Sequence, residues 1–113
     1  MLIKDNIKIT RLNHITANSI INVALNFDFN NCMTKISFKY RPDKFKIEQE
    51  SIKQYLTDLT NTENFNIEEL AARLTEDLYD MAVPLQIDVI IEQTIDDITT
   101  SISTSKSQPN FKK

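Results

Sequence analysis

The sequence predicts an α+β fold, in which a four-stranded antiparallel sheet packs against two helices that lie on one of its faces. Two segments near the start of the chain and two near its end alternate between apolar and polar residues, as strands with one buried face do. Between these pairs, two segments repeat their apolar residues every three or four positions, which is typical of amphipathic helices. Both helices must cover the same face of the sheet if every apolar stripe is to be buried.

The first two strands form a predicted hairpin over residues 19–41. Asn30 and Asn31 separate the two alternating runs, and asparagine adopts the left-handed conformation of tight turns more readily than most residues do. The apolar residues of the hairpin therefore share one face: Ile21, Val23, Leu25, Phe27, Phe29, Ile36, Phe38 and Tyr40.

Two helices are predicted next. The first has its apolar stripe between Ile47 and Leu59 and ends before a polar loop at residues 60–64. The second follows Asn66, a favourable capping residue with Glu69 three positions later. Pro84 ends it, because proline cannot continue a helix.

The second predicted hairpin joins residues 85–93 to residues 98–102, with Asp96 and Asp97 at its turn. Ile7 and Ile9 indicate one more short strand near the start of the chain.

These elements amount to one domain, which is what a chain of 113 residues accommodates. We expect this domain at residues 1–103, followed by a flexible polar tail at residues 104–113.

The complete absence of glycine excludes several classes of function. Dinucleotide-binding fingerprints, P-loops and nucleophile elbows all require glycine where the backbone approaches a phosphate or turns sharply. The net charge of −3 gives no general basic field, so nucleic acid is not an expected partner. A local basic strip remains compatible with this charge.

No apolar run approaches the roughly 18 residues of a membrane span. The first 20 residues mix charges with single apolar residues, unlike a secretory signal. Cys32 is the sole cysteine, so no internal disulfide can form. We therefore expect a cytoplasmic protein with no membrane partner.

The order of two hairpins and two helices resembles the tunnelling fold (T-fold), whose members assemble into barrels and bind purine-like or pterin bases between subunits. Within that fold, Tyr-Arg-Pro-Asp at residues 40–43 and the run at residues 48–56 resemble the 7-cyano-7-deazaguanine reductases of queuosine biosynthesis. That family has a Tyr-x-Pro-Asp strand end followed, at the same distance, by Glu-Ser-Lys-Ser-Leu-Lys-x-Tyr-Leu. The likeness continues through Glu68 and covers about residues 36–92.

The resemblance implies a homo-oligomer with sites between subunits and a guanine-like or 7-deazapurine base as the ligand. Glu68 falls where the family places the glutamate that accepts two N–H bonds from the base, a task suited to an ionised carboxylate. Glu48 and Ser51 match family residues beside the substrate and cofactor, which makes them further candidates for substrate binding. Lys53 matches a later lysine of the same run and is the candidate contact to NADPH, the reductant of the family.

The catalytic loop of the family has no counterpart in this chain. Counting back from Tyr40 without gaps places Ala24 and Asn31 where the family has its cysteine nucleophile and its aspartate. The resemblance therefore implies base recognition without standard nitrile reduction, and NADPH is expected only if the reductase activity is retained. Whether the chain is an enzyme stays open, and no catalytic residue is identified.

Cys32 lies on the same face of its predicted strand as Ile36 and Phe38, so packing in the core is its favoured role. The alternative is that Cys32 acts as a relocated nucleophile. His14 is the only histidine. One histidine and one cysteine cannot supply the three or four ligands of a zinc site, so no metal site is expected.

Two other functions stay open. The start of the second helix also resembles dihydroneopterin aldolase, a metal-free T-fold enzyme with a glutamate anchor, but the lysine which that enzyme needs is absent from residues 85–93. A non-catalytic structural or assembly subunit would fit the loss of the catalytic loop.

Overall fold

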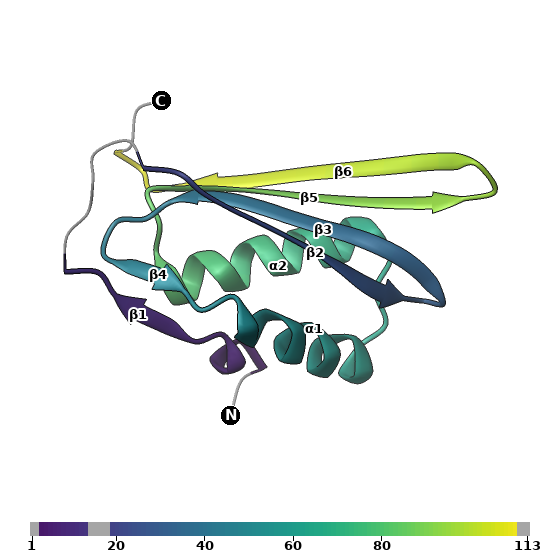
Figure 1. Cartoon of the computed structure of the whole chain (residues 1–113), viewed down its shortest axis with the longest axis horizontal. Helices are drawn as coiled ribbons and strands as arrows, with labels where there is room; N and C mark the ends of the chain where they lie inside the picture. The colour runs from purple at the N-terminus through teal and green to yellow at the C-terminus, as the bar shows by residue number, and fades with distance from the viewer. Residues whose placement is uncertain (1–2, 14–18, 111–113) are drawn as a thin grey trace.

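The computed structural model describes residues 3–13 and 19–110 of the chain (Figure 1). The predicted α+β class is confirmed, with two helices between two long hairpins. Among the described residues, neither helix has the length and apolar character needed to cross a membrane. The elements follow one another in this order: η1 (Ile3–Asn6), β1 (Ile9–Arg11), β2 (Ile21–Phe29), β3 (Cys32–Arg41), β4 (Phe45–Ile47), α1 (Glu50–Thr62), α2 (Ile67–Ala82), β5 (Gln86–Ile95) and β6 (Ile98–Ser107).

The predicted first hairpin is confirmed as β2 and β3. Asn30 and Asn31 both have positive φ angles, 53° and 63°, as a two-residue hairpin turn of the primed type requires. Phe29 therefore pairs directly with Cys32, and this register aligns the apolar side chains of both strands on one face.

The second hairpin, β5 and β6, has the same kind of two-residue turn. Asp96 and Asp97 have φ angles of 52° and 65°, and Ile95 pairs with Ile98 across the turn. Figure 1 shows the tip of this hairpin extending past the start of α2.

Strand β6 continues to Ser107, so the predicted end of the last strand, near residue 103, is wrong. Thr104 donates a hydrogen bond to the Ala71 carbonyl of α2 (3.2 Å), and Lys106 forms an ion pair with Glu76 (2.8 Å). The sequence does not show this extension, because residues 104–107 are all polar and have no hydrophobic alternation.

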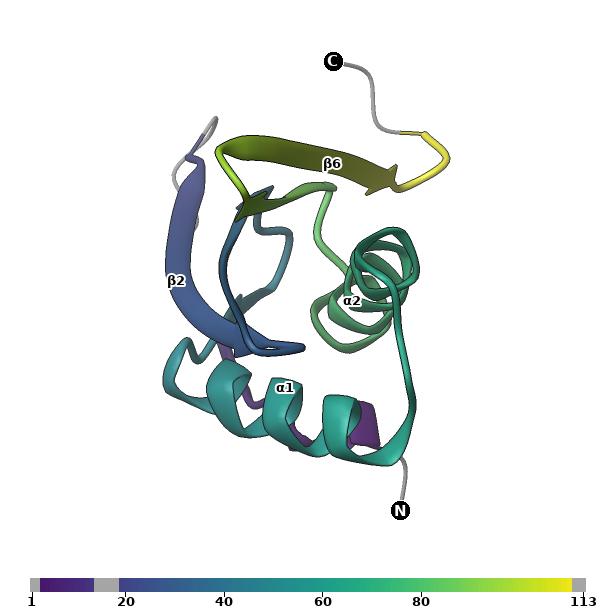
Figure 2. The ribbon, with the colours of Figure 1, turned by 90° about the vertical axis from the view of Figure 1, so that its right-hand side faces the viewer.

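The four long strands form one antiparallel sheet in the order β2-β3-β5-β6. Figure 2 shows this sheet curving around α1 and α2, which lie on the same side of it. The core between them consists mainly of the inward side chains of β3 and β5 and the apolar stripes of both helices, together with Ile7, Phe29 and Ile47. The opposite face of the sheet is covered by no helix or strand of residues 3–13 and 19–110.

The apolar stripe predicted for the first helix begins at Ile47, but helix α1 begins three residues later, at Glu50. Ile47 is the last residue of β4, where it pairs with Ile9 of β1 and donates its backbone N–H to the Tyr40 hydroxyl (2.9 Å). The strand partner lies far away in sequence, so local periodicity could not distinguish this strand from a helix start. Helix α1 also extends to Thr62, into the predicted loop.

The predicted start of α2 is confirmed. The Asn66 side chain accepts a hydrogen bond from the Glu69 backbone (2.7 Å), and the Glu69 carboxylate accepts one from the Asn66 backbone (3.1 Å). This reciprocal capping box satisfies two helix-terminal N–H groups.

The start of the chain forms a second, two-stranded sheet from β1 and β4. The predicted short strand is thus confirmed at Ile9, while Ile7 precedes it and is buried in the core with 1% of its surface exposed. His14, the sole histidine, lies outside the described residues.

Val83 ends α2 in the left-handed conformation, with φ 43° and ψ 57°. A β-branched residue is unfavourable there, and helices usually place glycine at such a position. The chain has no glycine, and Pro84 disfavours the ordinary helical conformation of the residue before it. Val83 is therefore a strained residue at a fixed helix end.

Replacing this valine by glycine should stabilise the protein. Relief of left-handed strain gives about 1–2 kcal/mol, and the greater freedom of glycine in the unfolded chain costs about 0.5–1 kcal/mol. We expect Val83→Gly to raise the free energy of unfolding by a net of about 0.5–1 kcal/mol. Val83→Ala, which keeps a Cβ atom, is the control in urea titrations. A glycine variant no more stable than the alanine variant would contradict the assignment of strain.

Candidate functional site

Glu68 lies exposed in the first turn of α2. Its neighbour Glu69 and the capping residue Asn66 already satisfy the end of the helix. Within the described part of the chain, the Glu68 carboxylate makes no hydrogen bond and no ion pair. Its acceptor oxygens are thus available to a molecule outside this chain.

The position of Glu68 on the helix places it toward β6. It precedes Ala71 by three residues and Thr75 by seven, so the three residues share one flank of α2. Both later residues contact β6, because Thr104 donates to the Ala71 carbonyl and its hydroxyl lies 2.5 Å from that of Thr75. Glu68 therefore belongs to the edge of the molecule formed by β6.

A groove of about 450 Å³ runs along the opposite edge of the sheet. Residues 22–25 of β2 form one wall, and Gln49, Glu50 and Lys53 at the start of α1 form the other. Lys53, the predicted cofactor contact, thus lines a groove. Sequence reasoning did not identify Gln49 and Glu50 as groove residues, since they are the capping residue and the first residue of an ordinary amphipathic helix.

Glu48 and Ser51, the other predicted substrate contacts, hold the start of the chain in place. The Ser51 hydroxyl accepts a hydrogen bond from the Lys8 backbone (3.0 Å) and donates one to the Glu48 carbonyl (2.6 Å). The Thr10 hydroxyl donates to the Glu48 carboxylate. Within a single chain these groups attach the β1 segment to the start of α1.

One chain does not bring the predicted site residues together. Glu48, Ser51 and Lys53 lie at the start of α1, and Glu68 follows the end of that helix. The 13 residues of α1 span about 20 Å at the helical rise per residue. A site that uses both groups needs two chains.

Cys32 begins β3 and is half-buried. It pairs with Phe29 and shares the face of β3 that packs toward the helices. Within the described ranges, no three side chains of histidine, cysteine, aspartate or glutamate gather closely enough to hold a metal ion.

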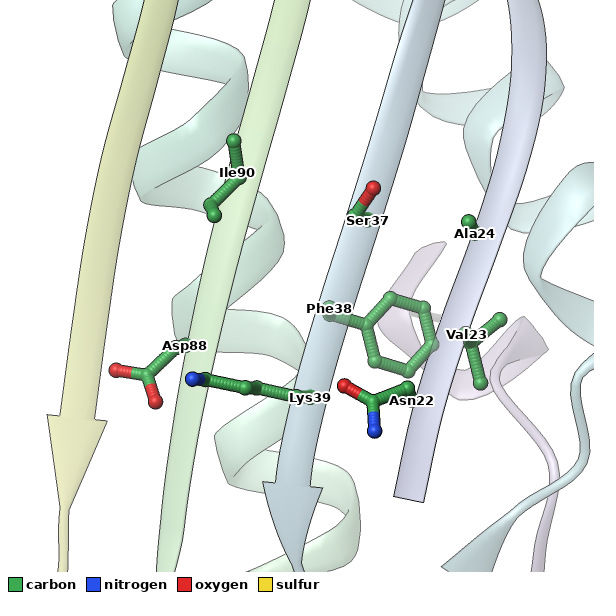
Figure 3. A pocket seen from close by; sticks show the side chains of 8 residues that line it. All are labelled: Asn22, Val23, Ala24, Ser37, Phe38, Lys39, Asp88 and Ile90. Atoms are coloured by element: carbon green, nitrogen blue, oxygen red, sulfur yellow. The ribbon is translucent and has the colours of Figure 1, made fainter. Parts of the chain in front are cut away.

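A shallow hollow of about 270 Å³ lies on the helix-free face of the sheet (Figure 3). The small side chains of Ala24 and Ser37, which pair across β2 and β3, leave this space open. Lys39 and Asp88 pair across β3 and β5 at its rim. None of the predicted site residues lines this hollow.

A buried carboxylate joins the two helices. Asp77 of α2 accepts hydrogen bonds from the Tyr55 hydroxyl of α1 (2.6 Å) and from Arg73 (3.1 Å), and Arg73 also binds Glu63 (3.1 Å). Burial, followed by the hydrogen bond and negative charge of Asp77, raises the pKa of Tyr55 above its ordinary value. These contacts are internal, so we assign the cluster to the stability of the helix pair.

Removing the Tyr55 hydroxyl should destabilise the protein and change its response to alkali. We expect Tyr55→Phe to lower the free energy of unfolding by about 1–3 kcal/mol, because Asp77 loses a buried donor. A raised pKa in the folded state means that the unfolded chain ionises first, so this stability is lost as the pH rises above about 10. The variant should therefore show a shallower loss of stability above that pH in denaturant titrations.

Tyr79→Phe is the matched control, since Tyr79, on the other helix α2, is only half-buried. Equal effects of the two substitutions would contradict the role of the buried pair.

Comparison with known proteins gives no family for this chain. No family model matches the sequence, and no curated protein matches it. The function is therefore argued from the fold and from the placement of the candidate residues.

Proposed function

We propose that this chain is a cytoplasmic T-fold subunit that binds a guanine-like or 7-deazapurine base, with Glu68 as the anchor of the base. The observation that supports this proposal is the exposed Glu68 carboxylate, which has no internal partner among the described residues and is not needed to cap α2. The strand order β2-β3-β5-β6, with both helices inserted between the hairpins, is compatible with that fold.

The chemistry of Glu68 suits a base with two adjacent N–H donors. An ionised carboxylate has two acceptor oxygens in one plane, and charge-assisted hydrogen bonds are stronger than neutral ones. The start of α2 favours the negative charge, because the helix dipole places partial positive charge there. Both carboxylate oxygens can therefore accept hydrogen bonds from one base.

The proposed site lies between two copies of the chain. Glu68 belongs to the β6 edge, whereas Gln49, Glu50 and Lys53 line the groove along the β2 edge. Pairing β6 of one copy with β2 of the next would bring these edges side by side, with Glu48 and Ser51 behind the groove. NADPH at Lys53 and nitrile reduction are not part of this proposal, because Ala24 and Asn31 occupy the positions of the family's cysteine and aspartate.

Both edges have the features that such pairing needs. A two-residue turn makes Ile95 and Ile98 a hydrogen-bonded pair, so every second residue of β6, including Ser103, directs its backbone N–H and C=O outward. Neither edge strand contains proline, which many monomeric proteins use to block an open edge. Except for Phe29, the inward apolar residues of β2 are only half-buried, so a neighbouring strand would cover them further.

Substitution of the anchor should abolish base binding. We expect Glu68→Gln to weaken binding of guanine or 7-cyano-7-deazaguanine about 10–100-fold, since one charged acceptor becomes a donor. Glu69→Gln, which changes the same charge one residue away, should bind within about twofold of the wild type because it touches no base. Isothermal titration calorimetry measures both, with dihydroneopterin as a third ligand.

Equal losses in the two variants, or no binding of any of these ligands to the wild type, would refute the role of Glu68. Binding of dihydroneopterin alone would indicate a pterin site in place of the deazapurine site.

Blocking the β6 edge should separate the copies. Ser103→Pro removes an outward N–H that makes no bond within the sheet, so the folded chain tolerates it while strand pairing does not. We expect light scattering to show an oligomer for the wild type and for Ser103→Ala, and a species near 13.1 kDa for Ser103→Pro. Circular dichroism checks that the variant is folded. A wild type of monomeric mass, or a proline variant that keeps the oligomeric mass, would contradict edge pairing.

A further inference from the structure

The small sheet formed by β1 and β4 has a cluster of positive charge at one end of the molecule. Thr10 pairs with Lys46 in this sheet, and the backbone bonds Glu48 to Lys8 and Leu12 to Lys44 continue the same register. Lys8, Lys44 and Lys46 therefore extend from one exposed face. Arg11 is exposed on the other face, where its guanidinium lies 5.9 Å from the centre of the Phe45 ring. We call these four cations and their two strands the basic ribbon.

The cations of the basic ribbon are not neutralised by ion pairs. Within residues 3–13 and 19–110, the ion pairs involve Lys4, Arg73 and Lys106, and none involves the ribbon. Glu48 shares the exposed face, where its carboxylate accepts a hydrogen bond from Thr10 and keeps its negative charge. That face therefore has three lysines and one carboxylate, and Arg11 adds a positive charge on the other face.

The rest of the chain is strongly acidic. Apart from these four cations, nine basic residues face sixteen acidic ones, which is a net charge of −7. A polyanion is therefore repelled by most of the molecule and attracted at this one end, so the charge distribution selects both the partner and its orientation. Figure 1 shows β1 and β4 at the end opposite the tip of the β5–β6 hairpin.

We propose that the basic ribbon binds the phosphate backbone of a single-stranded nucleic acid. Neither the groove beside β2 nor the hollow on the helix-free face is lined by these residues. Lys46 lies in β4, Lys44 lies one residue before that strand, and Lys8 immediately precedes the neighbouring strand β1. Exposed cations that lie next to one another in this way suit an extended chain of phosphates. The proposal is independent of base binding at Glu68.

Fluorescence anisotropy of a labelled 20-nucleotide RNA tests this interaction. With three or four phosphates contacted, the logarithm of the binding constant should fall with the logarithm of salt concentration at a slope of about −2 to −3. The variant Lys44→Glu with Lys46→Glu should bind at least about tenfold more weakly at 50 mM salt, with a slope shallower by about 1.4. The control is Lys35→Glu with Lys39→Glu, an identical change of charge on the helix-free face, where each lysine pairs with an acidic residue of β5.

Binding lost in the ribbon variant and kept in the control supports the proposal. Equal losses in both variants, a flat salt dependence, or no binding to the wild type at 50 mM salt overturns it. A ribbon variant that changes the oligomeric mass in light scattering, with RNA binding unchanged, also overturns it and assigns the ribbon to contact between copies. Guanine should still bind to the ribbon variant, because that variant leaves Glu68 unchanged. Titration of guanine into the variant therefore tests base binding separately from RNA binding.

Discussion

Two tight turns determine most of this architecture. Because Asn30 and Asn31, like Asp96 and Asp97, connect their strands without an extra residue, each hairpin has one register. A shift by a single residue would turn the apolar side chains to solvent, so the register and the core depend on each other. The register also determines which residues of the edge strands β2 and β6 direct their backbone N–H and C=O groups into the sheet and which direct them toward its open edges. The core under the helices, the polar helix-free face and the two edges all follow from these turns.

Local patterns predicted the elements that depend on local chemistry. The alternation of apolar and polar residues predicted both hairpins, and Asn66 with Glu69 predicted the start of α2. Both predictions were possible because turns and helix caps depend on residues only a few positions apart. The failures involve distant partners. Strand β4 exists because Ile47 pairs with Ile9, and the end of β6 is fixed by contacts between Thr104 and α2, neither of which leaves a hydrophobic period in the sequence.

The candidate site shows the same division. That Glu68 is not needed for capping could be predicted, since Asn66 and Glu69 form the capping box by themselves. The bonds of Ser51 and Glu48 to Lys8 and Thr10 could not, because about forty residues separate them. Glu48 and Ser51 resemble binding residues of the family, but in this fold their side chains also hold the β1 segment in place. Their resemblance alone is therefore weak evidence for a ligand site. The free carboxylate at the start of α2 and the groove beside β2 are therefore the stronger basis for a ligand site.

The absence of glycine connects the backbone to the distribution of charge. Without glycine, positive φ angles fall on asparagine, aspartate and Val83, and no backbone loop of the kind that cradles phosphate through its N–H groups is available. Recognition of charged or polar ligands must then come from side chains. Among the described residues, cations that form no ion pair gather in and beside β1 and β4 at one end, and carboxylates lie at the start of α2 and at the β5–β6 turn toward the other end. The proposed base anchor Glu68 and the proposed phosphate-binding lysines would thus lie toward different ends of one chain. The other wall of the proposed base site, with Glu48 and Ser51 behind it, adjoins the ribbon through Thr10 and Lys8.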